Sequence, residues 1–203
     1  MSEPMALPEP SDAELMARVR EGDRYAFTEL VDRHKDAVVS YLTRLTADRE
    51  RAEDLGQETF LRLFRSAADP GNHGNPGYAG GYREQGYLRA FIFRIATNLL
   101  RSEERRRRRW SLLKPFLPGR PHEEPAGPVG VLSRELTRQV QAALADLPLR
   151  FRVPLVLHEI EGWTYTDIAA ELGCQEGTVK SRIHRGRRQL KAKLTPYWQG
   201  GAP

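Results

Sequence analysis

Apolar residues recur at helical spacing along most of this sequence, and no segment alternates apolar and polar residues as a half-buried strand would. Two stretches interrupt this pattern. Residues 66–87 are rich in Gly, Tyr and Asn, and residues 110–130 contain five Pro and three Gly, so neither suits a regular element. The sequence therefore predicts an all-α protein of two small helical domains, residues 10–109 and 131–195, joined by a flexible linker at 110–130.

Helix boundaries follow from capping residues and glycines. Asp23 follows Gly22 and is a candidate N-cap, whose side chain would accept backbone amides of the next helix. Thr164 and Asp167 have the spacing of a capping box, and Gly173 tolerates the backbone of a tight turn. Helices are therefore predicted over residues 12–20, 23–45, 51–65, 87–109, 131–145 and 149–161, followed by a short helix from Thr164 and a last one over 176–190.

Composition excludes several classes of protein. No apolar run approaches the ~18–20 residues that cross a bilayer, and the N-terminus lacks the basic and apolar segments of a secretory signal. We therefore expect a cytoplasmic protein without membrane insertion. The single cysteine, Cys174, fits a reducing compartment and is expected in the core. The histidines are dispersed, so we expect no metal site, no cofactor and no small-molecule substrate.

The formal net charge of +5 hides an uneven distribution. Residues 1–60 contain fourteen acidic and eight basic side chains, whereas residues 177–203 contain seven Lys or Arg and no acid. Residues 101–109 contain six further Arg. This division suggests a protein partner for the acidic part and a polyanion for the basic helices, with a solvated charged surface as the alternative.

A helix, a short turn at Gly173 and a basic helix form the pattern of a helix-turn-helix. In the second helix, Val179, Ile183, Gly186 and Leu190 share one side, which is expected to face the core. The opposite side and its flanks carry groups that suit phosphates and base edges in the major groove, namely Thr178, Lys180, Ser181, His184, Arg185 and Arg188. The alternative is a solvated charged helix on a small bundle.

The helix predicted at 51–65 carries a stripe that points to a protein interface. An apolar leucine is framed there by acids and an amide, at Asp54, Gln57, Glu58 and Leu61, while Leu55, Phe60, Leu63 and Phe64 point elsewhere. An apolar residue with a polar rim resembles an interface hot spot. An ordinary core helix can show the same pattern, so both interpretations remain open at this point.

The helix predicted at 87–109 carries two neighbouring stripes. One is apolar and expected to be buried, at Leu88, Phe91, Ile92, Ile95 and Leu99. The other is polar, at Arg94, Asn98, Arg101 and Arg105. The arginines suit phosphate contacts, and the amide is placed to read a base edge.

Several segments together resemble the extracytoplasmic-function (ECF) sigma factors, bacterial initiation factors reduced to domains two and four. The resemblance lies in Glu161–Tyr165, Asp167–Ala169, Gly177–Arg185, Ala52–Leu55, Gln57–Phe64 and Ile95–Asn98. It implies a non-catalytic specificity subunit that directs core RNA polymerase to promoter DNA, held inactive by an anti-sigma factor. The polar face after Gly177 would read the −35 element, the Asn98 stripe would read and melt the −10 element, and residues 52–64 would dock on core polymerase.

The sequence departs from the family pattern in two places. Ser102 stands where the family often has Asp, and Glu103 and Glu104 place acids near the predicted DNA face. The loop at 66–87 is longer than in the family, where it captures a flipped base, and aromatic stacking offsets part of the cost of opening the duplex. The candidate residues are Asn72, His73, Asn75, Tyr78, Tyr82 and Tyr87, with a tolerated surface insertion as the alternative.

Two other functions account for parts of the sequence. A transcription regulator that binds duplex DNA without joining polymerase explains residues 164–190 but leaves the Leu61 and Asn98 stripes without a role. A nucleic-acid-processing enzyme would need clustered carboxylates, a His/Cys site or a Gly-rich phosphate loop, and none is recognisable.

Overall fold

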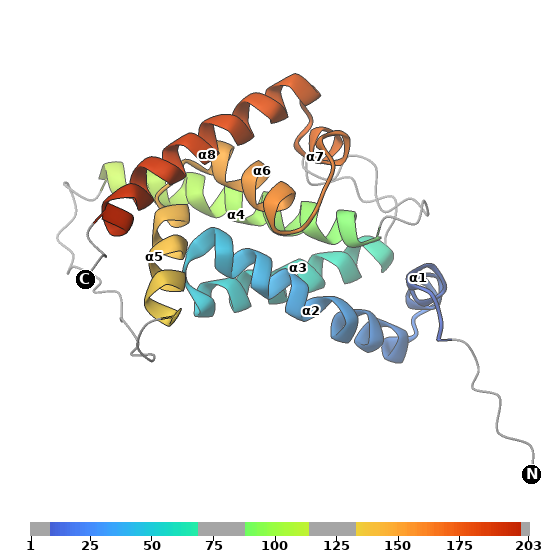
Figure 1. The fold of residues 1–203 in the computed structure, drawn as a ribbon. Coiled ribbons are helices and arrows are strands. Elements are labelled where there is room, and N and C mark those ends of the chain that lie inside the picture. Colours follow the sequence, from blue (N-terminus) through green and yellow to red (C-terminus); the bar gives the residue numbers. More distant parts are fainter. Residues whose placement is uncertain (1–8, 69–87, 114–132, 200–203) are drawn as a thin grey trace, which may run out of the picture.

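The structure is a computed structural model that describes residues 9–68, 88–113 and 133–199. These ranges fold into helices without strands, which confirms the predicted all-α class (Figure 1). The helices are α1 (Asp12–Arg20), α2 (Arg24–Thr46), α3 (Arg49–Ala68), α4 (Leu88–Leu113), α5 (Ser133–Ala145), α6 (Leu149–Glu159), α7 (Tyr165–Leu172) and α8 (Glu176–Gln199).

Most helices begin close to their predicted positions because the capping residues act as expected. The Asp23 carboxylate accepts the backbone amides of Tyr25 and Ala26 at 2.9 and 3.1 Å. The helices α4 and α8 are longer than predicted, since they continue past Arg109 and Leu190. No glycine occurs between either residue and the observed helix end, and Leu, Lys and Ala residues in these stretches favour continued helix, while α8 also continues past Pro196.

The N-terminal half, residues 9–113, packs α2, α3 and α4 on one another, with α1 against α2 and α3. The apolar residues predicted to line the inner side of α4 are all buried, as expected for Leu88, Phe91, Ile92, Ile95 and Leu99. Tyr41 on α2 is fully buried, and its hydroxyl group forms a 2.8 Å hydrogen bond with Thr97 on α4. The polar group therefore has a partner inside the core.

The C-terminal half, residues 133–199, contains the predicted helix-turn-helix in α7 and α8. The Asp167 amide donates to the Thr164 hydroxyl at 3.1 Å, and the Asp167 carboxylate accepts in return from the Thr164 amide, which confirms the capping box. Gly173 then ends α7 with φ +60°, a left-handed backbone that glycine adopts without strain.

The apolar side of α8 faces the core as predicted, and it lies against α6. Val179 and Ile183 are buried there, and Cys174 packs partly buried against the same core. At Gly186 an added Cβ would come within 3.3 Å of the Phe151 carbonyl oxygen of α6. The two helices therefore approach closely at this glycine, which explains its place among apolar residues.

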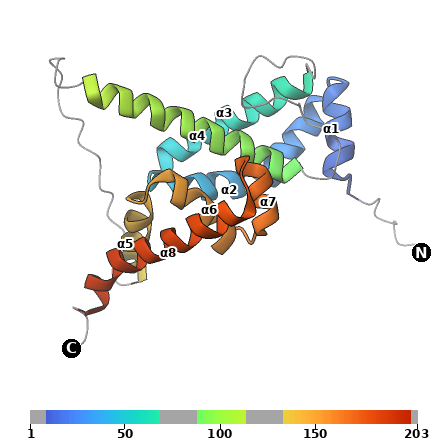
Figure 2. The same cartoon turned by 90° about the horizontal axis from the view of Figure 1, so that it is seen from above.

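The two halves lie against each other along much of their length. The helices α6, α7 and α8 lie on one side of α2 and α4, and α5 lies beside the end of α2 (Figures 1 and 2). Buried apolar residues from both halves form one continuous cluster. The C-terminal end of α4 projects beyond the other helices (Figure 2), and residues 105–109 on it are exposed.

Candidate nucleic-acid interface

The basic face of α8 is open to solvent. Lys180, Ser181, His184, Arg185 and Arg188 are all exposed, and Thr178 is half-buried at the start of the helix. The Ser181 hydroxyl donates to the Thr178 carbonyl at 2.9 Å, and the Lys180 ammonium lies 5.5 Å from the centre of the Tyr165 ring on α7. The structure thus brings all six predicted −35 residues onto one side of a helix whose other side is fixed in the core.

The polar stripe of α4 is partly covered, and Arg94 on it contacts the C-terminal half. Arg94, Asn98 and Arg101 are half-buried, and only Arg105 is exposed among the four predicted −10 residues. The Arg94 guanidinium donates to Glu171 on α7 at 3.0 Å. The residues are therefore aligned as predicted, but they do not all face solvent in this arrangement.

The pKa values of Arg101 and of the nearby Glu171 reflect this partial burial. Burial lowers the pKa of its guanidinium, the nearby Arg182 and Arg105 cations add to the decrease, and Tyr41 and Glu171 oppose it. Burial also raises the pKa of Glu171 to about 7, even though the Arg94 and Arg101 cations favour its ionised form. Desolvation therefore outweighs charge pairing for both groups.

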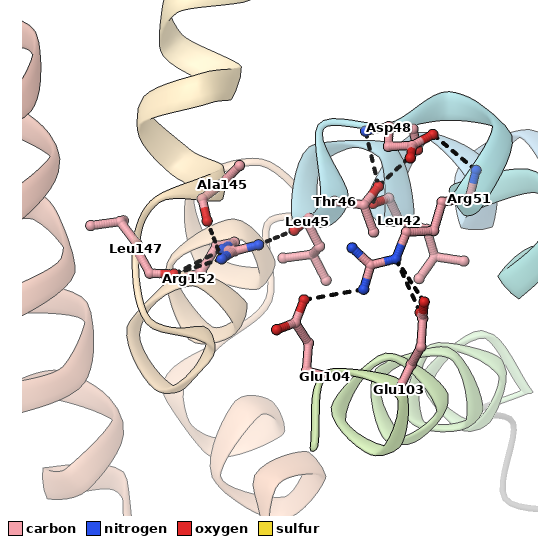
Figure 3. A network of polar contacts seen from close by, with 10 residues as sticks. All are labelled: Leu42, Leu45, Thr46, Asp48, Arg51, Glu103, Glu104, Ala145, Leu147 and Arg152. Atoms are coloured by element: carbon pink, nitrogen blue, oxygen red, sulfur yellow. Dashed lines mark hydrogen bonds and ion pairs between the residues drawn. The ribbon is translucent and has the colours of Figure 1, made fainter. Parts of the chain in front are cut away.

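The acids that follow Ser102 do not sit free beside the basic stripe. Arg51 on α3 donates to Glu103 at 3.0 Å and to Glu104 at 3.1 Å, with all three side chains mostly buried (Figure 3). One arginine thus offsets part of the charge of the two acids and ties α4 to α3. Ser102 instead accepts a 2.9 Å hydrogen bond from Arg105.

The predicted docking stripe lies on the outer side of α3. Asp54 and Gln57 are exposed, Leu61 is 49% exposed, and Glu58 forms an ion pair with Arg62 at 2.7 Å. Phe64, expected to point elsewhere, is also exposed by 36% and extends the apolar surface three residues from Leu61. An exposed leucine and phenylalanine on adjacent turns are typical of an interface.

The predicted base-capture residues lie outside the described part of the chain. They are Asn72, His73, Asn75, Tyr78, Tyr82 and Tyr87.

Three charged residues with buried side chains join the two halves and were not predicted, namely Arg152, Glu161 and Glu171. Arg152 donates to backbone carbonyls of Leu45, Ala145 and Leu147, and so binds the ends of α2 and α5 together (Figure 3). A signal for Glu171 was present in the sequence. It follows the buried Ile168 by three residues, which places a carboxylate close to the apolar side of its helix.

Within the described residues, no group of three or more His, Cys, Asp or Glu side chains is arranged to hold a metal ion. None of the helices described is long and apolar enough to cross a membrane.

Two segments of the chain match known families: residues 30–78 match Sigma-70 region 2, and residues 137–190 match Sigma-70, region 4. The chain is 38% identical over 196 residues to the ECF RNA polymerase sigma factor SigE of Mycolicibacterium smegmatis, covering 93% of this chain and 71% of that protein. It is 31% identical over 195 residues to the ECF RNA polymerase sigma-E factor of Haemophilus influenzae, covering 92% and 96%.

The fold is similar to that of the sigma factor RpoE in its co-crystal structure with the anti-sigma factor NepR from Bartonella quintana. The TM-score is 0.63 at 24% sequence identity, and the match covers 83% of this chain and 96% of that one. As its motifs predicted, the chain belongs to the ECF RNA polymerase sigma factor family.

Proposed function

We propose that this sigma factor is a non-catalytic subunit that brings core RNA polymerase to particular promoters in the cytoplasm. The observation that carries the proposal is the solvent-exposed basic face of α8 on a well-packed helix-turn-helix. In this proposal, residues 10–109 form the region 2 domain, residues 131–195 form the region 4 domain, and residues 110–130 link them.

In this proposal, each predicted set of site residues has one binding role. The face of α8 reads the −35 element through Thr178, Lys180, Ser181, His184, Arg185 and Arg188, because cations and hydroxyls suit phosphates and major-groove edges. The α4 stripe of Arg94, Asn98, Arg101 and Arg105 contacts the −10 element, and the loop residues Asn72, His73, Asn75, Tyr78, Tyr82 and Tyr87 hold a flipped base. Asp54, Gln57, Glu58 and Leu61 dock on core polymerase.

An anti-sigma protein is the second proposed partner. The solved sigma factor RpoE, which shares this fold, was crystallised with the anti-sigma factor NepR. We propose that a protein of this class also binds the present chain and keeps it from core polymerase.

In vitro transcription with purified core polymerase tests the main proposal. Run-off transcripts from a genomic promoter library should appear only when the chain is added, and Leu61→Asp should abolish them while leaving binding to free DNA unchanged. Tyr25→Asp, the same apolar-to-acid change at an exposed site on α2, serves as the matched control. Duplex binding without any core-dependent transcript would instead identify a regulator that acts apart from polymerase.

A further inference from the structure

The Tyr165 ring at the start of α7 contacts a histidine of α6 and a lysine of α8. The His158 ring stacks on it, with 4.6 Å between the ring centroids and 27° between the ring planes. The Lys180 ammonium lies over the same ring, 5.5 Å from its centre. One aromatic side chain therefore connects the basic face of α8 to the two helices that precede it.

Neighbouring hydrogen bonds fix the position of this ring. The His158 Nδ1 atom lies 2.9 Å from the Trp163 carbonyl oxygen, and it donates there because a carbonyl only accepts. The Thr166 hydroxyl donates to the Glu176 carboxylate at 2.6 Å, which ties the first turn of α7 to the first turn of α8. The ring is therefore held in place beside Lys180 by the packing of three helices.

Lys180 has no acid that competes with the ring for its charge. Glu176 precedes Lys180 by four residues, so it lies one helical turn away, but its carboxylate accepts from Thr166. Within the described residues, Lys180 forms no ion pair. The face of Tyr165 is therefore the attractive contact that remains for the ammonium, because a cation is favoured over an aromatic face.

The place of Lys180 in α8 gives this contact a consequence for recognition. Lys180 is exposed near the N-terminal end of the second helix of the helix-turn-helix, where side chains reach base edges. A free lysine side chain is flexible and reaches several phosphates and base edges. An ammonium that rests on a fixed ring approaches the groove from one direction and loses less freedom on binding.

We propose that Tyr165 is a positioning residue that sets specificity, because its ring aims the Lys180 ammonium at one base pair of the duplex bound by α8. That this duplex is the −35 element rests on the proposed function, whereas the contact between the ring and the ammonium does not. Without the ring, Lys180 still binds DNA, but it no longer favours that base pair.

Nuclear magnetic resonance of the full chain without DNA tests the contact. Nuclear Overhauser effects should connect the Tyr165 ring protons with the ε-methylene protons of Lys180, and the ring current should shift these methylene signals upfield. Tyr165→Leu should move them to the position of the exposed Lys191, and Tyr165→Phe should leave them in place. Absence of the Overhauser effects in the wild type would overturn the proposal, and this result needs no variant to fold.

A double-mutant cycle tests whether the contact acts on DNA. The probe is a short duplex selected by the full chain from a randomised pool, and fluorescence anisotropy measures its affinity without core polymerase. The loss caused by Lys180→Ala should be about two- to fivefold smaller in Tyr165→Leu than in the wild type. Arg188→Ala, on the same exposed face, is the matched control and should cause the same loss in both backgrounds. Equal losses for Lys180→Ala in both backgrounds would overturn the proposal.

Base preference separates positioning from a general structural role. In selections from the same pool, Tyr165→Leu should relax the preference at the base pair that Lys180→Ala relaxes and leave the others unchanged. A uniform loss of affinity across sequences would overturn the proposal by assigning Tyr165 to the stability of the helix-turn-helix. These measurements contain no transcription, so a chain that meets them but yields no transcripts would refute only the proposed function.

Discussion

The basic face of α8 and the basic stripe of α4 have similar side chains but different surroundings. On α8, Lys180, His184, Arg185 and Arg188 face solvent, whereas on α4 Arg94 is paired with Glu171 and Arg101 is half-buried. Both helices have a polar stripe beside an apolar one, so their amphipathic pattern does not distinguish them. The difference arises because one helix lies at the edge of the packed halves and the other lies between them.

The largest effect is expected when a buried side chain that anchors α8 to the core is truncated. Ile183→Ala should lower the free energy of unfolding by about 4 kcal/mol, because this fully buried side chain fixes α8 on the core. Thermal and urea unfolding followed by circular dichroism measure the loss. Ala192→Gly, at an exposed site on the same helix, should cost only about 1 kcal/mol. Similar losses for both would show that the apolar side of α8 does not anchor it.

A slightly smaller effect is expected at the joint between the halves. Arg152→Met should lower the free energy of unfolding by about 3 kcal/mol, because it leaves the carbonyls of Leu45, Ala145 and Leu147 without their buried donor. Arg150→Met is the matched control, since Arg150 is exposed on the same helix. Urea unfolding of both variants checks the difference, and an Arg152 variant as stable as the control would contradict it.

Substitutions on the two basic surfaces should also have different effects on the affinity of the free protein for DNA. Arg185→Ala should weaken binding to a duplex carrying the −35 element by about 2 kcal/mol, since the guanidinium is already exposed. Arg94→Ala should change this affinity by much less. Fluorescence anisotropy against a set of −35 sequences measures both, and a loss for Arg185→Ala that is uniform across sequences would assign it to a phosphate.

The smallest effect is expected from pH. Burial raises the pKa of Glu171 from 4.5 to about 7, although the Arg94 and Arg101 cations favour its ionised form, so the folded protein binds a proton that the unfolded chain releases. A raised acid pKa contributes stability that is fully present below pH 4.5 and is lost as the pH rises through about 7. The free energy of unfolding, measured by urea unfolding at a series of pH values, should therefore fall across this window. Glu171→Gln should remove the dependence, and an unchanged pH profile in that variant would assign it to another group.

Local signals in the sequence were sufficient for much of the fold. Asp23, Thr164 and Gly173 set helix ends through hydrogen bonds and backbone freedom that operate within a few residues. Errors occurred at the extended end of α4, where no local stop signal precedes Leu113, and at that of α8, which continues past Pro196. The ion pairs of Arg51 with Glu103 and Glu104 could not be predicted from the sequence, because these residues meet only when α3 packs against α4.

The sequence by itself determined the helices, the side of each helix that is buried, and the residue types available to contact DNA and polymerase. These properties depend on spacing and side-chain chemistry along one element. Tertiary structure alone decided which basic stripe is accessible and which charges pair across the halves. Burial of Glu171 beside Arg94 requires two helices distant in the chain to meet, and periodicity within either helix does not encode that meeting.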